Sequence, residues 1–176
     1  MMQVANRGNY QLSEQQYFDI IQRKTATLIG TCCRLGARFA DADSSVVQRL
    51  RAFGESLGIA FQIIDDVLDL VGDEAEVGKS LGRDADMGKL TLPLIHYLRT
   101  SAPRQQEQML ALLRGPVPHR RRRIAALLRD TGSLQYARSV AERFVGQAQE
   151  AVRSLPPSDA RESLSAIAEF ALDRNQ

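Results

Sequence analysis

One stretch decides the fold: residues 45–71 read SVVQRLRAFGESLGIAFQIIDDVLDLV. Apolar side chains recur in it in steps of three and four, which is the period of an α-helix and not of a β-strand. No proline precedes Pro93, and proline is the residue that most strongly breaks a helix. The stretch therefore predicts one helix, about 40 Å long at roughly 1.5 Å per residue. Its apolar stripe consists of Val46, Leu50, Phe53, Leu57, Phe61, Ile64, Leu68 and Val71.

The rest of the chain is also predicted to be helical. Ser13 and Gln16 have the spacing of a capping box, which starts a helix that extends to about residue 40. Residues 72–88 are rich in glycine and are expected to form an ordered loop. The remaining helices are predicted at residues 89–99, 102–114, 119–129, 134–154 and 160–172. Since no segment alternates with period two, the predicted fold class is all-α, in a single domain over residues 1–176.

Composition excludes several classes of protein. The chain has 176 residues, of which 44% are hydrophobic, and 23 Lys and Arg against 21 Asp and Glu. These values argue against a disordered chain and against a protein that coats nucleic acid. No apolar run approaches the roughly 20 residues of a membrane-spanning helix. The adjacent Cys32 and Cys33 are expected to be small buried residues in a reducing, cytoplasmic setting.

The second half of the long helix carries a narrow polar strip. Gln62, Asp65, Asp66 and Asp69 fall within an arc of about 100°. An acidic strip is commonly a solvated helix face, but such a face mixes charges, and none of the three aspartates has a Lys or Arg three or four residues away. Carboxylates so close together repel unless they share a cation. Oxygen ligands without His or Cys favour Mg²⁺.

The glycine-rich segment adds positive charge near this strip in the sequence. Lys79 and Lys89 lie among glycines, in residues 78–84 and 88–89. Glycine lets a backbone approach a ligand closely. Each lysine taken singly is expected to be a solvated surface residue. Together with the aspartates and Mg²⁺, they predict a site that binds a diphosphate.

Five short motifs follow one another along the chain: QRKTA at 22–26, FQxxDDxxD at 61–69, GKxxGxD at 78–84, GKxTLP at 88–93 and GSLQYAR at 132–138. In this order and spacing they resemble the trans-prenyltransferases, the isoprenyl diphosphate synthases that make farnesyl, geranylgeranyl and longer polyprenyl diphosphates. The resemblance implies the C-terminal part of the isoprenoid-synthase helical bundle, as the C-terminal portion of a larger polyprenyl synthase domain.

The resemblance implies a role for each matching residue. The implied Mg²⁺ ligands, acting directly or through water, are Asp65, Asp66 and Asp69. The implied diphosphate-binding residues are Lys24, Gln62, Lys79 and Lys89. The implied catalytic residues, which line the cavity where a carbocation forms, are Lys24, Thr25 and Gln62.

The implied reaction is polyprenyl diphosphate synthesis, in which isopentenyl diphosphate condenses with an allylic diphosphate. The family has two aspartate-rich motifs, and this sequence shows one, so we expect an incomplete enzyme. Because members of the family are usually homodimers, the resemblance implies a homodimer; the missing motif suggests instead a partner chain that supplies it. The run Arg120–Arg123 is expected to be solvated, and does not match the family's arginine pair.

Three other functions are compatible with parts of the pattern. The chain could be a non-catalytic subunit of a heteromeric prenyl synthase, which co-purification with a second family member would favour. It could be a helical interaction protein that lost its activity, although such a scaffold would not need carboxylates on a mostly buried helix. It could be a class I terpene cyclase, although Lys24-Thr25 and Gly88-Lys89 fit a chain-elongating enzyme better.

Overall fold

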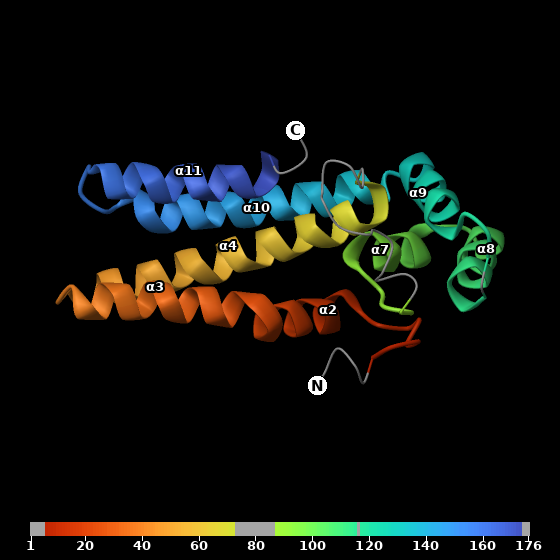
Figure 1. Ribbon diagram of the computed structural model, residues 1–176, viewed down its shortest axis with the longest axis horizontal. Helices are drawn as coiled ribbons and strands as arrows, with labels where there is room; N and C mark the ends of the chain where they lie inside the picture. Colours follow the sequence, from red (N-terminus) through yellow and green to blue (C-terminus); the bar gives the residue numbers. More distant parts are fainter. Residues whose placement is uncertain (1–5, 73–86, 116, 174–176) are drawn as a thin grey trace. The chain divides into compact units, whose positions relative to one another are not determined.

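A computed structural model describes residues 6–72, 87–115 and 117–173. All regular structure in these ranges is helical (Figure 1), which confirms the all-α fold class. No helix in the described ranges is long and apolar enough to cross a membrane. The elements are α2 (Glu14–Ile21), η1 (Gln22–Ala26), α3 (Thr27–Phe39), α4 (Ser44–Val71), α7 (Leu92–Thr100), α8 (Pro103–Arg114), α9 (Arg120–Asp130), α10 (Ser133–Arg153) and α11 (Asp159–Asp173).

Most helix boundaries lie within one or two residues of the prediction, and local capping explains the starts of α2 and α4. The backbone N–H of Gln16 donates to Ser13 Oγ at 3.2 Å, and the side-chain oxygen Gln16 Oε1 accepts from the backbone N–H of Ser13 at 2.9 Å. These two hydrogen bonds confirm the capping box at α2. Asp43 caps α4 by accepting from the backbone N–H of Val46 at 3.0 Å. Helix α7 starts at Leu92, three residues later than predicted, with Pro93 in its first turn.

The prediction of one uninterrupted helix to about residue 40 is wrong in one respect. Residues 22–26 form the π-helical turn η1 between α2 and α3. The backbone N–H of Thr27 donates to Gln22 O, five residues back, and the Thr27 hydroxyl donates to the same carbonyl at 2.8 Å. The hydroxyl therefore stabilises the wider turn. Isolated π-helical turns occur frequently at functional sites, and this one contains Lys24 and Thr25.

The chain divides into two compact units, which we describe separately. Unit 1 comprises Met1–Ile20 and Asp65–Arg138, and unit 2 comprises Ile21–Ile64 and Ser139–Gln176. Helices α4 and α10 each contribute residues to both units. The expectation of one domain over residues 1–176 stays a prediction.

Unit 1 has a core of large apolar side chains from α2, the end of α4, and α7 to α9. The Tyr17, Leu92, Tyr97, Met109, Ile124 and Leu128 side chains have 2% or less of their surface exposed. The N-terminal segment is joined to this core, because the Tyr10 hydroxyl donates to Leu113 O at 3.2 Å. The segment before α7 is joined to it as well, since the Gly8 N–H donates to Gly88 O at 2.9 Å.

Unit 2 contains an unusually close approach between α4 and the helices η1 and α3. A Cβ atom on Gly58 would lie 2.5 Å from Ala26 Cα, and one on Gly54 would lie 2.8 Å from Gly30 Cα. Side chains larger than hydrogen at these positions would push the backbones apart. Helix α11 runs alongside α10 (Figure 1), where the Gln149 amide donates to Glu169 Oε1 at 2.8 Å.

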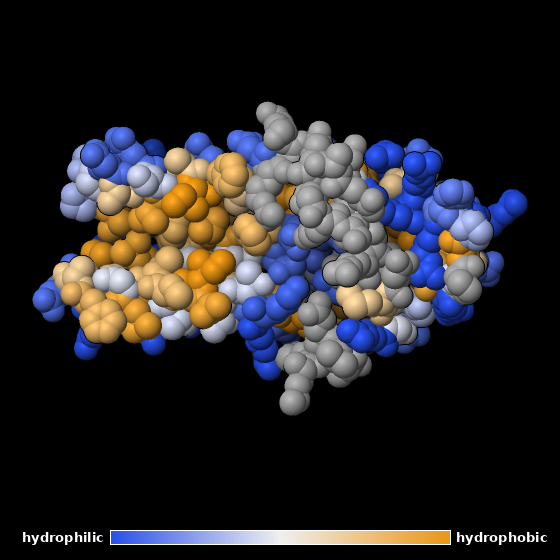
Figure 2. Space-filling view, viewed as in Figure 1, coloured by the Kyte–Doolittle hydropathy of each residue, from blue (hydrophilic) through white to orange (hydrophobic). Residues whose placement is uncertain are grey.

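Unit 2 also exposes much apolar surface, which Figure 2 shows as orange residues at the left. On α3, the exposed fractions are 67% for Leu28, 42% for Leu35 and 84% for Phe39. Cys32 lies on the same helical stripe and is exposed, and Cys33 is half-buried. The expectation that both cysteines are buried is therefore wrong. Burial raises the pKa of the Cys33 thiol, and the neighbouring Cys32 raises it further.

Candidate functional site

The polar strip predicted on α4 is a buried strip and not a solvated helix face. Asp66 is fully buried, Gln62 and Asp69 are 4% and 6% exposed, and Asp65 is half-buried. Most of the apolar residues around the strip are buried as well. Phe61 is the exception, since 38% of its surface is exposed. Buried carboxylates need charged or hydrogen-bonding partners.

Asp66 has such partners on both carboxylate oxygens. The Tyr17 hydroxyl, from α2, donates to Asp66 Oδ2 at 2.8 Å. The Lys89 ammonium, from the segment before α7, donates to Asp66 Oδ1 at 3.3 Å. All three residues belong to unit 1. Sequence spacing predicted that the aspartates need a shared cation, and the protein itself supplies one to Asp66 from 23 residues away.

Lys89 is therefore not the solvated surface residue that is expected for a single lysine in a sequence. Only 11% of its side chain is exposed, and its ammonium is held by the fully buried Asp66. The adjacent Gly88 has a φ of +64°, a conformation that glycine adopts without strain. Lys79, the other lysine predicted in this region, lies outside the described residues.

In unit 2, two of the predicted catalytic residues contact each other. The Thr25 hydroxyl donates to Gln62 Oε1 at 2.8 Å. Thr25 lies in η1, and the close approach at Gly58 brings η1 near α4. Lys24 lies beside Thr25 in the same turn and is exposed. The pairing could not be found from spacing, because the two residues are 37 positions apart.

Few of the described residues are placed to hold a divalent cation. Among the described residues, no three His, Cys, Asp or Glu side chains are clustered so that they could hold a metal ion. Mg²⁺ commonly takes only one or two carboxylates, and its other ligands are water and substrate phosphate. Asp65 and Asp69 lie one helical turn apart on α4, and Asp66, between them, contacts Tyr17 and Lys89.

The sequence suggested that the arginine run of α9 is solvated, but two of its four side chains donate hydrogen bonds to backbone carbonyls. The Arg121 guanidinium is half-buried and donates to Leu70 O at 3.3 Å and to Gly72 O, at the C-terminal end of α4. Arg120 donates to Gly115 O. Carbonyls at a helix C-terminus lack partners within the helix, so Arg121 satisfies them and balances their partial negative charge. Arg122 and Arg123 are exposed, as predicted.

The fold and these residues define an all-α protein with a lysine-paired carboxylate on its longest described helix. The family model that matches is that of polyprenyl synthetase, over residues 1–130, and the chain belongs to this family. It is 36% identical over 165 residues to the nonaprenyl diphosphate synthase of Mycobacterium tuberculosis, covering 93% of this chain and 49% of that protein. It is 33% identical over 169 residues to the heptaprenyl diphosphate synthase component 2 of Bacillus subtilis, covering 96% of this chain and 48% of that protein.

A solved structure agrees with this assignment. The polyprenyl synthase of Caulobacter crescentus, complexed with calcium and isoprenyl diphosphate, superposes with a TM-score of 0.91 at 33% identity. The match covers 99% of this chain and 54% of that chain. This chain therefore spans about half the length of the curated relatives it matches. The comparisons do not bear out the expectation of an incomplete enzyme.

Proposed function

We propose that the chain carries diphosphate-binding machinery for trans-prenyl transfer, the condensation of isopentenyl diphosphate with an allylic diphosphate. The observation that carries the proposal is the pairing of Lys89 with the buried Asp66 on the aspartate-bearing helix. Membership of the polyprenyl synthetase family supports it. So does the Caulobacter crescentus relative, whose structure was solved with a divalent cation and isoprenyl diphosphate.

In this proposal the aspartates have different roles. Asp65 binds Mg²⁺, and Asp69 holds it directly or through water. Asp66 is a positioning residue, because its two oxygens accept from Tyr17 and Lys89. It fixes the Lys89 ammonium, so that little side-chain entropy is lost when the lysine binds a diphosphate oxygen. Bound Mg²⁺ would balance the negative charge that develops on the leaving diphosphate.

The residues of unit 2 are assigned by the same proposal. Thr25 holds the Gln62 side-chain carbonyl at 2.8 Å, which leaves the Gln62 NH₂ as the donor end of the amide. We propose that this amide and Lys24 donate to diphosphate oxygens, as does Lys79. In the reaction the allylic C–O bond breaks with its electron pair on diphosphate, the double bond of isopentenyl diphosphate forms the new C–C bond, and a proton leaves.

The proposal is tested by a prenyl-transfer assay with Mg²⁺, labelled isopentenyl diphosphate and an allylic diphosphate. We expect product from the wild-type chain, alone or with the partner proposed below, and at least a hundredfold less from Asp65→Asn. Asp173→Asn, an exposed aspartate in α11, is the matched control and should leave product unchanged. Equal product from Asp65→Asn and wild type would refute the assignment.

We also propose that a protein partner covers the apolar stripe of α3, either a second copy or a chain that carries the other aspartate-rich motif. The stripe of Leu28, Leu35 and Phe39 is exposed (Figure 2), and contiguous exposed apolar surface marks interaction sites. A Bacillus subtilis relative is named as component 2 of its synthase. The cytoplasmic location expected from the cysteines stays a prediction.

Light scattering after gel filtration distinguishes a second copy of the chain from a different partner chain. We expect a dimer of the pure chain, or co-elution with a second family member, and Phe39→Asp should abolish the association. Ala40→Asp, at the next position and also exposed, should leave it intact. A wild-type chain that stays monomeric and retains no second family member would contradict the proposal.

A further inference from the structure

The first turn of α9 carries more positive charge than its packing requires. Arg120–Arg123 occupy the N-terminal end of this helix, where the helix dipole favours anions and disfavours cations. Two of the four are accounted for, because Arg120 and Arg121 donate to backbone carbonyls. Arg122 and Arg123 are exposed. A local arrangement that opposes helix stability without a packing reason commonly marks a functional site.

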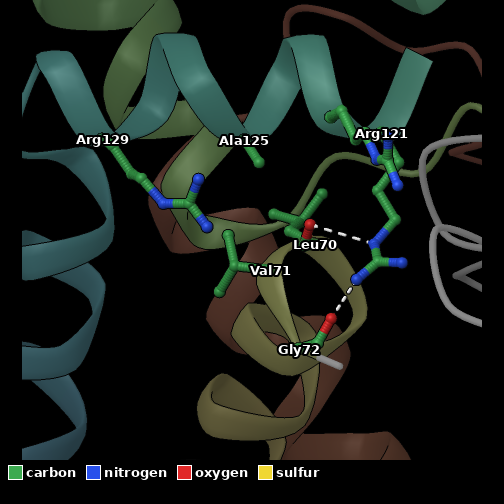
Figure 3. A pocket seen from close by; sticks show the side chains of 7 residues that line it. Leu70, Val71, Gly72, Arg121, Ala125 and Arg129 are labelled. Carbon is green, nitrogen blue, oxygen red and sulfur yellow. Dashed lines mark hydrogen bonds between the residues drawn. The ribbon is translucent and has the colours of Figure 1, made fainter. Parts of the chain in front are cut away.

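A pocket of about 560 Å³ lies beside this turn (Figure 3). The described residues that line it are Leu70, Val71, Gly72, Arg121, Arg122, Ala125 and Arg129. The described lining thus has three guanidinium groups and no carboxylate. Ala125 lies four residues from both Arg121 and Arg129 on α9 (Figure 3). Because the Ala125 side chain is small, it leaves the space of the pocket between the longer side chains of Arg121 and Arg129.

The three arginine side chains of the pocket differ in their hydrogen bonding. Arg121 is fixed by its hydrogen bonds to Leu70 O and Gly72 O, as Figure 3 shows. Those bonds also balance the partial negative charge at the end of α4, which would otherwise repel an anion. The Arg122 and Arg129 side chains make no hydrogen bond or ion pair within the parts of the chain that the structure describes. Because the three guanidinium groups line one pocket, their like charges repel one another, and a bound anion would relieve the repulsion.

We propose that this arginine pocket, defined by Arg121, Arg122 and Arg129, binds the phosphate group of an anionic ligand. Guanidinium groups form paired hydrogen bonds with phosphate oxygens, and arginine is the side chain best suited to this geometry. The pocket uses none of the residues assigned above to prenyl transfer, and it needs no divalent cation. It is therefore a second anion site, whose ligand carries a phosphate or diphosphate either free or as a lipid headgroup.

The test is calorimetric titration of the full chain with sodium phosphate and with sodium diphosphate, in EDTA so that no Mg²⁺-dependent site contributes. We expect Arg122→Gln/Arg129→Gln to weaken binding at least tenfold. Arg104→Gln/Arg123→Gln removes the same charge from exposed positions outside the pocket and should change the affinity less than twofold. If the glutamine variant does not fold, Arg122→Lys/Arg129→Lys keeps the charge, loses the paired geometry, and should still bind several times more weakly.

A second arm identifies the source of the phosphate group. Sedimentation with vesicles of phosphatidylcholine, with and without phosphatidylglycerol, reports binding to a lipid headgroup. Binding to soluble phosphate, to anionic vesicles or to both supports the proposal, provided that it depends on Arg122 and Arg129. The absence of both kinds of binding, or an equal loss in the control variant, would overturn it. Neither result depends on prenyl transfer.

Discussion

Two polar pairs on α4 are stabilised in opposite ways. In unit 1, Asp66 is a fully buried charge that is balanced by Lys89 and by the Tyr17 hydroxyl. In unit 2, Gln62 is a neutral amide that accepts one hydrogen bond from Thr25, across helices that approach closely at Gly58. The difference shows that the first pair depends on electrostatic balance, whereas the second depends on backbone proximity.

Removing the buried charge should have the largest effect. Asp66→Ala leaves the Lys89 ammonium and the Tyr17 hydroxyl without their common acceptor, so we expect a loss of about 3 kcal/mol in the free energy of unfolding. Urea denaturation measures it, and a double-mutant cycle with Lys89→Met isolates the pair. The two effects should deviate from additivity by about 1 kcal/mol or more. Additive effects would show that Asp66 and Lys89 are independent.

Adding a methyl group at the close approach should have the next largest effect. In Gly58→Ala the new Cβ would lie 2.5 Å from Ala26 Cα, and backbone cannot yield as a flexible side chain can. We expect a loss of about 2 kcal/mol by overpacking. Gly36→Ala is the matched control on α3, since nothing lies within 4 Å of a Cβ there. It should instead stabilise the helix by about 0.5–1 kcal/mol, and equal effects of the two substitutions would contradict the comparison.

Deleting one hydroxyl from each pair compares them directly. Tyr17→Phe removes a hydrogen bond to a charged acceptor, with an expected loss of about 1.5 kcal/mol in the free energy of unfolding. Thr25→Val removes one to a neutral amide, with an expected loss of about 1 kcal/mol. Thr25→Ser keeps the hydroxyl and should be milder than Thr25→Val. A larger loss in Thr25→Val than in Tyr17→Phe would reverse the comparison.

The smallest expected effect is the pH dependence that His96 gives to unit 1, in which it lies. Burial lowers the pKa of His96, and the Arg99 charge lowers it further, while Glu14 opposes them. As the pH falls below about 6.5, the unfolded chain takes up this proton before the folded chain does. The free energy of unfolding should therefore decrease below that pH.

His96→Gln isolates this contribution. The side chain of His96 lies 3.1 Å from Ser133 Oγ and stacks on Tyr136, so the variant will change stability at every pH. The informative quantity is the difference between pH 7.5 and pH 5.5 in urea denaturation. It should be smaller in His96→Gln than in the wild type. An equal difference in both proteins would show that His96 does not contribute.

The sequence predicts the elements of this fold well, because long amphipathic helices leave a strong periodic pattern. The apolar stripe of residues 45–71 and the capping box at Ser13 locate α4 and α2 within about one residue. The π-helical turn at residues 22–26 has no such pattern. It arises from the hydrogen bonds that Thr27 donates to Gln22 O. Both residue types also occur in ordinary α-helices, so the sequence does not mark the turn.

The candidate site was predicted in its residue types but not in its pairings. The spacing of Asp65, Asp66 and Asp69 indicated a missing cation, yet Lys89 is 23 residues from Asp66 and a loop lies between them. Nothing in the sequence marked the Tyr17 hydroxyl as a hydrogen-bond partner of Asp66. The role of Arg121 was missed because a run of four arginines reads as solvated. Such contacts depend on tertiary packing, which periodicity does not encode.

We propose above that Lys89, Asp65 and Asp69 bind a Mg²⁺-diphosphate. Calorimetric titration with diphosphate, with and without Mg²⁺, tests it most directly. It is best done in the Arg122→Gln/Arg129→Gln background, so that the arginine pocket does not contribute. We predict Mg²⁺-dependent binding that Asp65→Asn and Lys89→Met each weaken at least tenfold, with Asp173→Asn unchanged. Binding that is independent of Mg²⁺, or that survives both substitutions, would contradict the account.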